Sequence, residues 1–430
     1  APTFFLRCRI RGDDRPRFGC AGHLDMNLPG HRIRPLAASA AFWAWCALVS
    51  YPMIVANVNL AEAVAEFTIS PAAIMYQVIG LSLFLATMCI AYHHRFVPTV
   101  GRLDFAQLSI VAIICLSFVL QLHGNETATL AGILYTVLLL ATAWTLSVLW
   151  TLDNAALERC MSVAAAILCV FGIAAIAILG WPQNRAVGSI QPNLFATPLL
   201  AAFIFSQFRP GVLGIVVRIL CLGMVALVSS RFALIGCITA LVLHEMTFNP
   251  LSRAKIPALF ITAVAVIVFW PQIASILALD DSTRGFSSGF SGRDDRWHLW
   301  LETMPQNPFG IGFKRAIGEE AGHNGYMKLL LEFGIPGGGL LIFFLVCSLA
   351  LAGADAVRRA GKSRPQHRFD CARFGGLAAV LFSGFFQPQL FSLGDAFAVS
   401  VTLLLFKPGT KSIPARKPVM RSGRAVVQQL

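Results

Sequence analysis

The sequence predicts an all-α, polytopic membrane protein, a bundle of about 12 transmembrane helices with one large loop outside the membrane. Three observations lead to this class. Hydrophobic residues make up 57% of the 430 residues and charged residues only 13%, against about 25% charged residues in soluble domains. The mean hydropathy is +0.70. Apolar stretches of membrane length alternate with shorter polar connections along the chain.

The predicted spans are apolar segments close to the roughly 20 residues that a helix needs to cross the hydrocarbon. In chain order they are 36–57, 70–92, 105–122, 129–151, 160–180, 194–208, 211–229, 232–247, 256–279, 335–353, 372–389 and 392–406. Helices 1–9 thus occupy 36–279, and helices 10–12 occupy 335–406. The last two spans are short, so a re-entrant pair or a tilted hairpin is an alternative there.

Basic residues orient the bundle, because Lys and Arg near span ends are retained in the cytoplasm. They gather in alternate connections, at Arg95, Arg102, Arg159, Arg209, Arg253, Lys255 and the arginines and lysine between 358 and 373. The connections at 58–69 and 123–128 hold glutamates and no basic residue. We therefore expect cytoplasmic termini and an outside loop at 280–334. The net charge of +13 then reflects topology, and no nucleic-acid partner is predicted.

Both termini are basic segments without a predicted span. Residues 1–35 lack the apolar core of a secretory signal peptide. They are expected to be either a disordered cytoplasmic arm or, as far as residue 25, a stretch upstream of a true start at Met26. Residues 407–430 are expected to form a solvated cytoplasmic tail.

Chemistry is expected on the outer side, where charged residues are otherwise sparse. Arg231 follows two serines at a span junction, Arg185 lies in the connection WPQNRAVGSIQPN, and Arg293 lies in Ser-Gly-Arg within the large loop. Guanidinium groups bind phosphate oxygens bidentately and stay charged. The three arginines are therefore candidates to bind the diphosphate of a lipid carrier. The alternatives are snorkelling to headgroups and pairing with nearby acids.

His323 leads a short apolar helix, HNGYMKLLLEFG, that is expected to break at Gly334. An imidazole titrates close to neutral pH, so His323 is a candidate to take the proton of an attacking hydroxyl. A histidine that caps the helix or contacts headgroups is the alternative. Asn324 and Tyr326 are candidate supporting residues.

Other polar features carry weaker predictions. Trp300 fits interfacial anchoring or stacking on a sugar ring. The turn NPFGIG at 307–312 either lets backbone N–H groups approach a ligand or only turns the chain. Lys328 and Glu332 are spaced to pair on a helix. The paired aspartates in the loop lack an Asp-X-Asp spacing, so neither a metal nor another cofactor is predicted.

In combination, these motifs resemble the O-antigen ligase/O-antigen polymerase superfamily, which also includes bacterial protein O-oligosaccharyltransferases. The resemblance is carried by Ser-Gly-Arg, Trp300, NPFGIG, His323-Asn324 followed by GIPG, and, upstream, Ser230-Arg231 and QPNLFA. It covers roughly residues 180–345 in detail and the rest only by hydropathy.

The resemblance implies a membrane glycosyltransferase of the GT-C type, at the periplasmic face of the bacterial inner membrane, that needs no metal. Its donor would be a glycan on undecaprenyl diphosphate. Arg231 and Arg293 would hold the diphosphate, with Arg185 a less secure third, and His323 would activate or orient the acceptor hydroxyl. Direct displacement would invert the anomeric centre.

Several functions stay open within and outside this superfamily. The preferred one is an O-antigen ligase of lipopolysaccharide biosynthesis, which transfers the glycan to lipid A-core. A polymerase and a protein O-oligosaccharyltransferase use the same donor chemistry. A lipid-glycan transporter is a fourth, although transporters usually place polar residues at mid-bilayer in repeated halves. Membrane lipids are the remaining expected partners.

Overall fold

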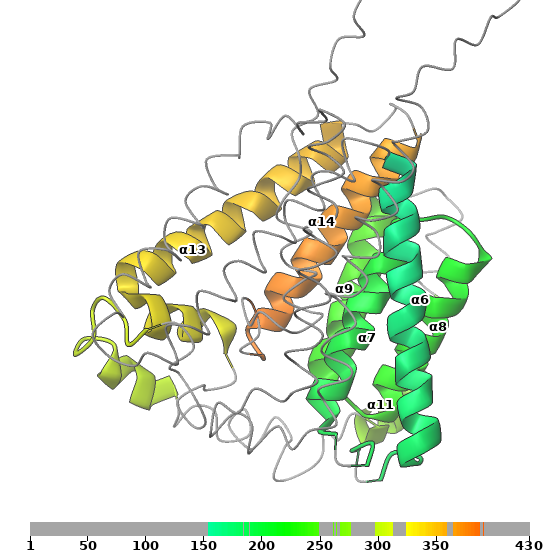
Figure 1. The fold of residues 1–430 in the computed structure, drawn as a ribbon, viewed down its shortest axis with the longest axis horizontal. Coiled ribbons are helices and arrows are strands. Elements are labelled where there is room, and N and C mark those ends of the chain that lie inside the picture. The colour runs from blue at the N-terminus through cyan, green and yellow to red at the C-terminus, as the bar shows by residue number, and fades with distance from the viewer. Residues whose placement is uncertain are drawn as a thin grey trace, which may run out of the picture.

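The computed structural model of the protein describes residues 154–183, 185–188, 190–248, 261, 264, 267–276, 297–312, 324–358, 364–387 and 390. Their regular structure is helical, without a strand (Figure 1). Three of their helices are long and apolar enough to span a membrane. The all-α class is thus confirmed for these residues. The expected spans at 36–57, 70–92, 105–122, 129–151 and 392–406 and both terminal segments lie outside them.

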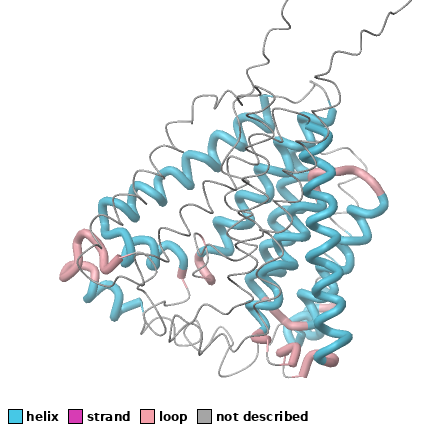
Figure 2. Tube along the Cα trace, in the orientation of Figure 1, coloured by secondary structure: helices cyan, strands magenta, loops and turns pink. Residues whose placement is uncertain are grey.

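The chain runs back and forth through adjacent helices (Figure 2). The elements are α6 (Asn154–Leu179), α7 (Pro192–Ser206), α8 (Val212–Leu227), α9 (Arg231–Phe248), the short α11 (Trp270–Ile276), α13 (Gly325–Arg358) and α14 (Arg364–Gly384). Residues 297–303 are also helical. Helix α14 lies between α9 and α13 and packs on both (Figure 1). Of the expected span 256–279, the structure describes α11 and four helical positions before it.

This alternation gives the bundle two different ends. One end, the site end, holds the α6–α7 connection, the α8–α9 turn, the start of α13 and the end of α14. The other, the basic end, holds the α7–α8 connection and the start of α14 (Figure 1). Most described arginines lie toward the basic end, at positions 159, 209, 218, 358, 364, 368 and 373. The described basic residues at the site end are Arg185, Arg231 and Lys328.

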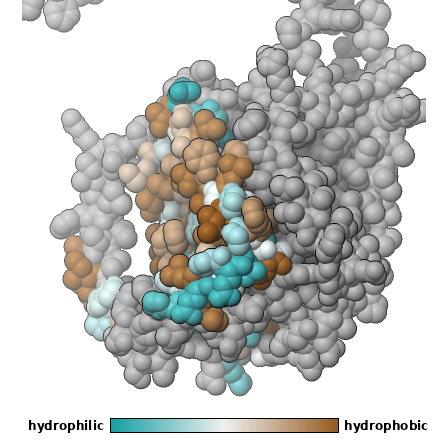
Figure 3. Space-filling model, turned by 90° about the vertical axis from the view of Figure 1, so that its left-hand side faces the viewer, coloured by the Kyte–Doolittle hydropathy of each residue, from teal (hydrophilic) through white to brown (hydrophobic). Residues whose placement is uncertain are grey.

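Helix α7 forms the centre of the described bundle. Its side chains are apolar on every side, and all residues from Phe195 to Ser206 are buried, as expected for a helix without a polar face. Its neighbour α8 and the outer helix α13 instead expose rows of large apolar side chains, including Val212, Ile215, Ile219, Phe343 and Leu351. Figure 3 shows such apolar side chains next to a hydrophilic band. Exposed apolar surface of this extent fits contact with lipid.

Small residues bring α9 and α14 into close contact. A Cβ atom added to Gly375 of α14 would lie 2.5 Å from the carbonyl oxygen of Ala240 in α9. A Cβ atom added to Gly236 of α9 would lie 2.9 Å from Oγ of Ser383 in α14. Such small-residue contacts are typical of packed membrane helices, because backbones can then approach closely.

Helices α6, α13 and α14 extend beyond the predicted spans. Helix α14 starts at Arg364, not at 372, so the expectation that Arg368 and Arg373 lie in a loop is wrong. Hydropathy ends a span at the first cluster of charges, whereas a helix continues where those charges find partners. Here Arg373 is buried and lies 3.9 Å from Asp355 of α13. Helix α13 contains the predicted break, since Gly334 has non-helical dihedral angles.

Candidate functional site

The α8–α9 turn closes helix α8 with a left-handed serine. Ser229 has φ of 49°, its N–H donates to the carbonyl of Ala226, and the next N–H, of Ser230, donates to the carbonyl of Val225. This pairing is a Schellman motif, in which the left-handed position is usually a glycine. A residue with a Cβ atom is strained there by about 1–2 kcal/mol. Other contacts must therefore hold the turn.

Arg185 supplies those contacts from the α6–α7 connection. Its Nε donates to the carbonyl of Val228 at 3.4 Å, and its Nη2 donates to the carbonyl of Ser229 at 2.5 Å. Arg185 itself has φ of 75° and lies in a tight turn closed by reciprocal hydrogen bonds between Gln183 and Ala186. Cations near a helix C-terminus are stabilising, because free carbonyl groups and the helix dipole meet there.

The QPNLFA motif holds the same turn from the other side. Pro192 occupies the first turn of α7, where its missing N–H has no consequence. The side-chain oxygen of Asn193 accepts a hydrogen bond from Ser230 Oγ at 3.2 Å. Arg231, half-buried, follows as the first residue of α9. We call Arg185, Asn193, Ser229, Ser230 and Arg231 the arginine cluster.

The start of α13 is capped by Asn324, the residue after His323. Its side-chain oxygen accepts hydrogen bonds from the N–H groups of Tyr326 at 3.0 Å and Met327 at 3.2 Å. Asparagine is among the best N-cap residues because it satisfies N–H groups that lack a helical partner. The hydroxyl of Tyr326 donates to the carbonyl of Leu381 in α14 at 2.5 Å. Asn324 and Tyr326 thus fix where α13 begins and attach it to α14.

The NPFGIG turn packs backbone to backbone against the break in α13. Pro336 has no N–H for the carbonyl of Glu332, and the N–H of Ile335 turns away from Leu331 to the carbonyl of Pro308, at 3.1 Å. The two carbonyls left without helical partners, those of Leu331 and Glu332, accept hydrogen bonds from Ile311 at 2.9 Å and Gly312 at 3.1 Å. Every backbone group that the break releases at these positions is therefore paired again.

Glycines make this approach sterically feasible. A Cβ atom on Gly310 would lie 2.4 Å from the backbone nitrogen of Gly334, and one on Gly334 would lie 2.4 Å from the carbonyl oxygen of Pro308. Both glycines also have positive φ, 90° and 73°. The predicted alternatives for the turn were approach to a ligand or a simple reversal, and the structure shows a third use, docking on α13. We call 307–312 with 324–336 the kink cluster.

Side chains reinforce the kink cluster. Lys328 Nζ lies 3.6 Å from the Oε1 atom of buried Glu332, so the predicted pair is confirmed. Trp300 is 1% exposed and packs with Met304 and Leu331. In this structure neither face of the indole is open to a sugar or to the membrane surface. Trp300 joins residues 297–304 to α13.

The end of α14 lies between the two clusters. Ser383 faces Gly236, just over one turn into α9 from Arg231, and Leu381 accepts the hydrogen bond of Tyr326. The carbonyl of Gln387 would meet a Cβ atom on Gly325 at 2.9 Å. The arginine cluster and the kink cluster are therefore parts of one packed site end. Arg293 and His323, with 280–296 and 313–323 of the predicted loop, lie outside the described residues.

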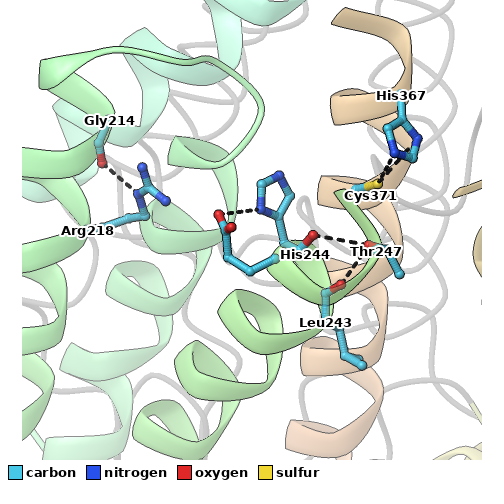
Figure 4. A network of polar contacts seen from close by, with 8 residues as sticks. Gly214, Arg218, Leu243, His244, Thr247, His367 and Cys371 are labelled. Atoms are coloured by element: carbon cyan, nitrogen blue, oxygen red, sulfur yellow. Dashed lines mark hydrogen bonds and ion pairs between the residues drawn. The ribbon is translucent and has the colours of Figure 1, made fainter. Parts of the chain in front are cut away.

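A second polar group lies near the basic end (Figure 4). His244 Nδ1 is 3.4 Å from Glu245, and its ring stacks on Phe248, which also stacks on His367. The guanidinium of Arg368 lies over the same Phe248 ring. These contacts link α9 with α14 at the end opposite to Arg231, and sequence patterns did not indicate them. The hydropathy of 364–371 predicts a loop, so His367 and Arg368 were not expected to belong to a helix that packs on α9.

Comparisons with known proteins do not assign the chain to a family, because neither the protein-family models nor the curated proteins give a match. Among the described residues, no group of three or more His, Cys, Asp or Glu side chains is arranged to hold a metal ion. The case for a function thus depends on the arrangement of the site end and on the resemblance of its motifs.

Replacing Gly310 with alanine should destabilise the protein by roughly 2–4 kcal/mol, because the new Cβ adds a backbone clash to a strained φ. The measurement is the midpoint of thermal unfolding of the purified protein in detergent. Gly339→Ala is the matched control, since a Cβ atom at Gly339 meets nothing within 4 Å. Equal midpoints for the two variants would contradict the docking of NPFGIG on α13.

Proposed function

We propose that the protein is an O-antigen ligase, a membrane glycosyltransferase that transfers a glycan from undecaprenyl diphosphate to lipid A-core. One observation carries the proposal. The described motifs that resemble the superfamily, QPNLFA, Ser230-Arg231, NPFGIG and Asn324 with GIPG, are spread over residues 191–337 of the chain yet pack at one end of the bundle, as the two clusters joined by α14. The alternation of the helices alone brings these connections to one end, and the proposal is supported by the direct contacts between motifs that are distant in the chain, QPNLFA with Ser230 and NPFGIG with the break in α13.

The charge distribution supports the orientation of this enzyme in the bacterial inner membrane. The arginines toward the basic end mark the cytoplasmic side. The site end then faces the periplasm, where carrier-linked glycans and lipid A-core are joined. Cytoplasmic termini and a GT-C arrangement of about 12 helices belong to the same proposal.

Arg231 is suited to stabilise the departing diphosphate. Its side chain is half-buried, so its charge is screened less than that of an exposed arginine. It also begins α9, and the first N–H groups and the dipole of a helix favour an anion. Fixed cations aimed at the place where negative charge develops lower the barrier without a metal ion. In the proposal, Arg293 from the large loop completes the diphosphate site.

His323 is the proposed acceptor base. The acceptor hydroxyl attacks the anomeric carbon, the bond from that carbon to the phosphate oxygen breaks, and undecaprenyl diphosphate leaves. The hydroxyl proton passes to the imidazole of His323, and the anomeric centre inverts. Asn324, the next residue, is held by two N–H groups of α13. The residue that follows the proposed base is therefore held in place by the start of α13.

A polymerase or a protein O-oligosaccharyltransferase is the alternative in the same superfamily, because both use the same donor. A transporter fits less well. Most described basic residues lie toward the helix ends, with Arg373 near the middle of α14 as an exception, whereas transporters usually place polar groups at mid-bilayer.

Loss of Arg231 should abolish most transfer without loss of protein. We expect Arg231→Ala to lower the transfer rate roughly 100-fold or more, as removal of one electrostatic donor does elsewhere. Arg231→Lys should lose roughly tenfold, since it keeps the charge but not the bidentate fork. Transfer in membrane vesicles, normalised to protein level, is the measurement. Exposed Arg209, in the α7–α8 connection, gives the control Arg209→Ala. Near-normal transfer by Arg231→Ala would remove Arg231 from the site.

Binding and chemistry should separate at His323. His323→Ala is expected to bind the undecaprenyl-diphosphate-linked glycan within about twofold of the unaltered protein and to transfer it roughly 10²–10⁴ times more slowly. The arginines hold the donor independently of proton removal. Donor affinity and single-turnover rate of the same purified variant are the two measurements. A variant that loses affinity and rate together would show that His323 binds the donor.

Deletion of the gene distinguishes the acceptors. A ligase defect leaves long polymer on the lipid carrier and bare lipid A-core. If single repeat units remain attached to lipid A-core, the protein is a polymerase and the ligase assignment is wrong. Unchanged lipopolysaccharide would instead direct the search to protein glycosylation or to another glycan. The measurement is electrophoresis of lipopolysaccharide together with mass spectrometry of carrier-linked glycans.

A further inference from the structure

The side chain of Arg185 is directed at protein carbonyl groups. Its Nε and Nη2 donate to two successive carbonyls, those of Val228 and Ser229. These carbonyls directly follow α8, which ends at Leu227, and so lie beyond the hydrogen bonds of that helix. A guanidinium presents its donors as a rigid fork, which suits two neighbouring acceptors of fixed spacing.

The two residues that meet in this contact are both strained. Arg185 has φ of 75° and Ser229 has φ of 49°, and the described residues contain no other non-glycine residue with positive φ. Strained residues persist only where the surrounding structure determines their conformation, and they concentrate at functional sites. Here the strained serine lies two residues before Arg231, and Ser230, bound to Asn193, lies between them.

We propose that Arg185 is a positioning residue that sets the place of Arg231 through the α8–α9 turn, and is not itself a ligand of the diphosphate. This revises the role that the sequence predicted for Arg185, alongside Arg231 and Arg293. The proposal rests on the proposed function in one respect only, the binding of the donor diphosphate by Arg231.

If Arg185 acts through the turn, the effect of removing it depends on which residue occupies position 229. Without the hydrogen bonds from Arg185, Ser229 relieves its backbone strain by leaving the left-handed region. The turn and the first residue of α9 then move with it. Glycine adopts that region without the steric penalty of a Cβ atom. The substitution Ser229→Gly therefore preserves the turn when Arg185 is absent. A direct ligand of the diphosphate has no such dependence on position 229.

The test is a cycle of the unaltered protein, Arg185→Ala, Ser229→Gly and the double variant, purified in lipid nanodiscs. Two quantities are measured: KM and kcat for the undecaprenyl-diphosphate-linked glycan, and hydrogen exchange of backbone amides in 226–234. With Ser229 in place, we expect Arg185→Ala to lower kcat/KM for the donor about tenfold, because Arg231 is displaced from the departing diphosphate, and to speed exchange in the turn. In the Ser229→Gly background both effects should fall to about threefold or less. Arg209→Ala, at the other end of the bundle, should change neither.

Equal losses of kcat/KM in both backgrounds, with unchanged exchange, would overturn the proposal and return Arg185 to the diphosphate site. If Arg185→Ala does not yield folded protein, Arg185→Lys takes its place. It keeps the charge but loses the fork, so faster exchange in the turn supports the positioning role and unchanged exchange refutes it. If the unaltered protein transfers no glycan, the proposed function fails, and the exchange measurements still decide whether Arg185 holds the turn.

Discussion

The structure depends most on the pairing of backbone groups where helices end or break inside the bundle. In an apolar environment an unpaired N–H or C=O group costs several kcal/mol, so a chain segment can interrupt a helix only where another segment supplies the partners. At the break in α13, those partners are the N–H groups of Ile311 and Gly312 and the carbonyl of Pro308. After the end of α8, the guanidinium of Arg185 donates hydrogen bonds to the carbonyls of Val228 and Ser229.

This constraint explains why each cluster joins segments that are distant in the sequence. At each interruption the partners come from a connection that is distant in the sequence: 307–312 docks on α13, and Arg185 of the α6–α7 connection binds the α8–α9 turn. Helix α14, tied to α9 by close packing and to α13 by the hydroxyl of Tyr326, joins them. A cation at the start of α9 is thereby placed on a fixed frame. Electrostatic catalysis requires a charge in a fixed position, because a charged group that must move during the reaction stabilises the transition state less.

The sequence predicted the features that depend on composition and on short-range chemistry. The all-α class, the break at Gly334 and the Lys328–Glu332 pair followed from hydropathy, from glycine and proline, and from helical spacing. The contacts between distant segments did not follow. Nothing local indicates that Asn193 meets Ser230, or that Trp300 is buried rather than open at an interface. Arg185 was predicted to bind a diphosphate for the same reason that it suits carbonyl groups, because a guanidinium binds any well-placed pair of oxygen acceptors. The start of α14 was missed because 364–371 is rich in charge, and hydropathy does not show that Arg368 there has a partner in Phe248 of α9.

The central claim, transfer of a glycan from a lipid diphosphate without a metal ion, is tested most directly by reconstitution. The purified protein in lipid nanodiscs would receive undecaprenyl-diphosphate-linked O-antigen and lipid A-core in the presence of a chelator. Mass spectrometry would then measure glycosylated lipid A-core and free undecaprenyl diphosphate. The account predicts that the two products form in equal amounts and that the chelator does not slow the reaction. Two results would contradict the claim. In one, no undecaprenyl diphosphate is released with any of three acceptors: lipid A-core, a second carrier-linked glycan or a protein. In the other, the reaction strictly requires a divalent cation.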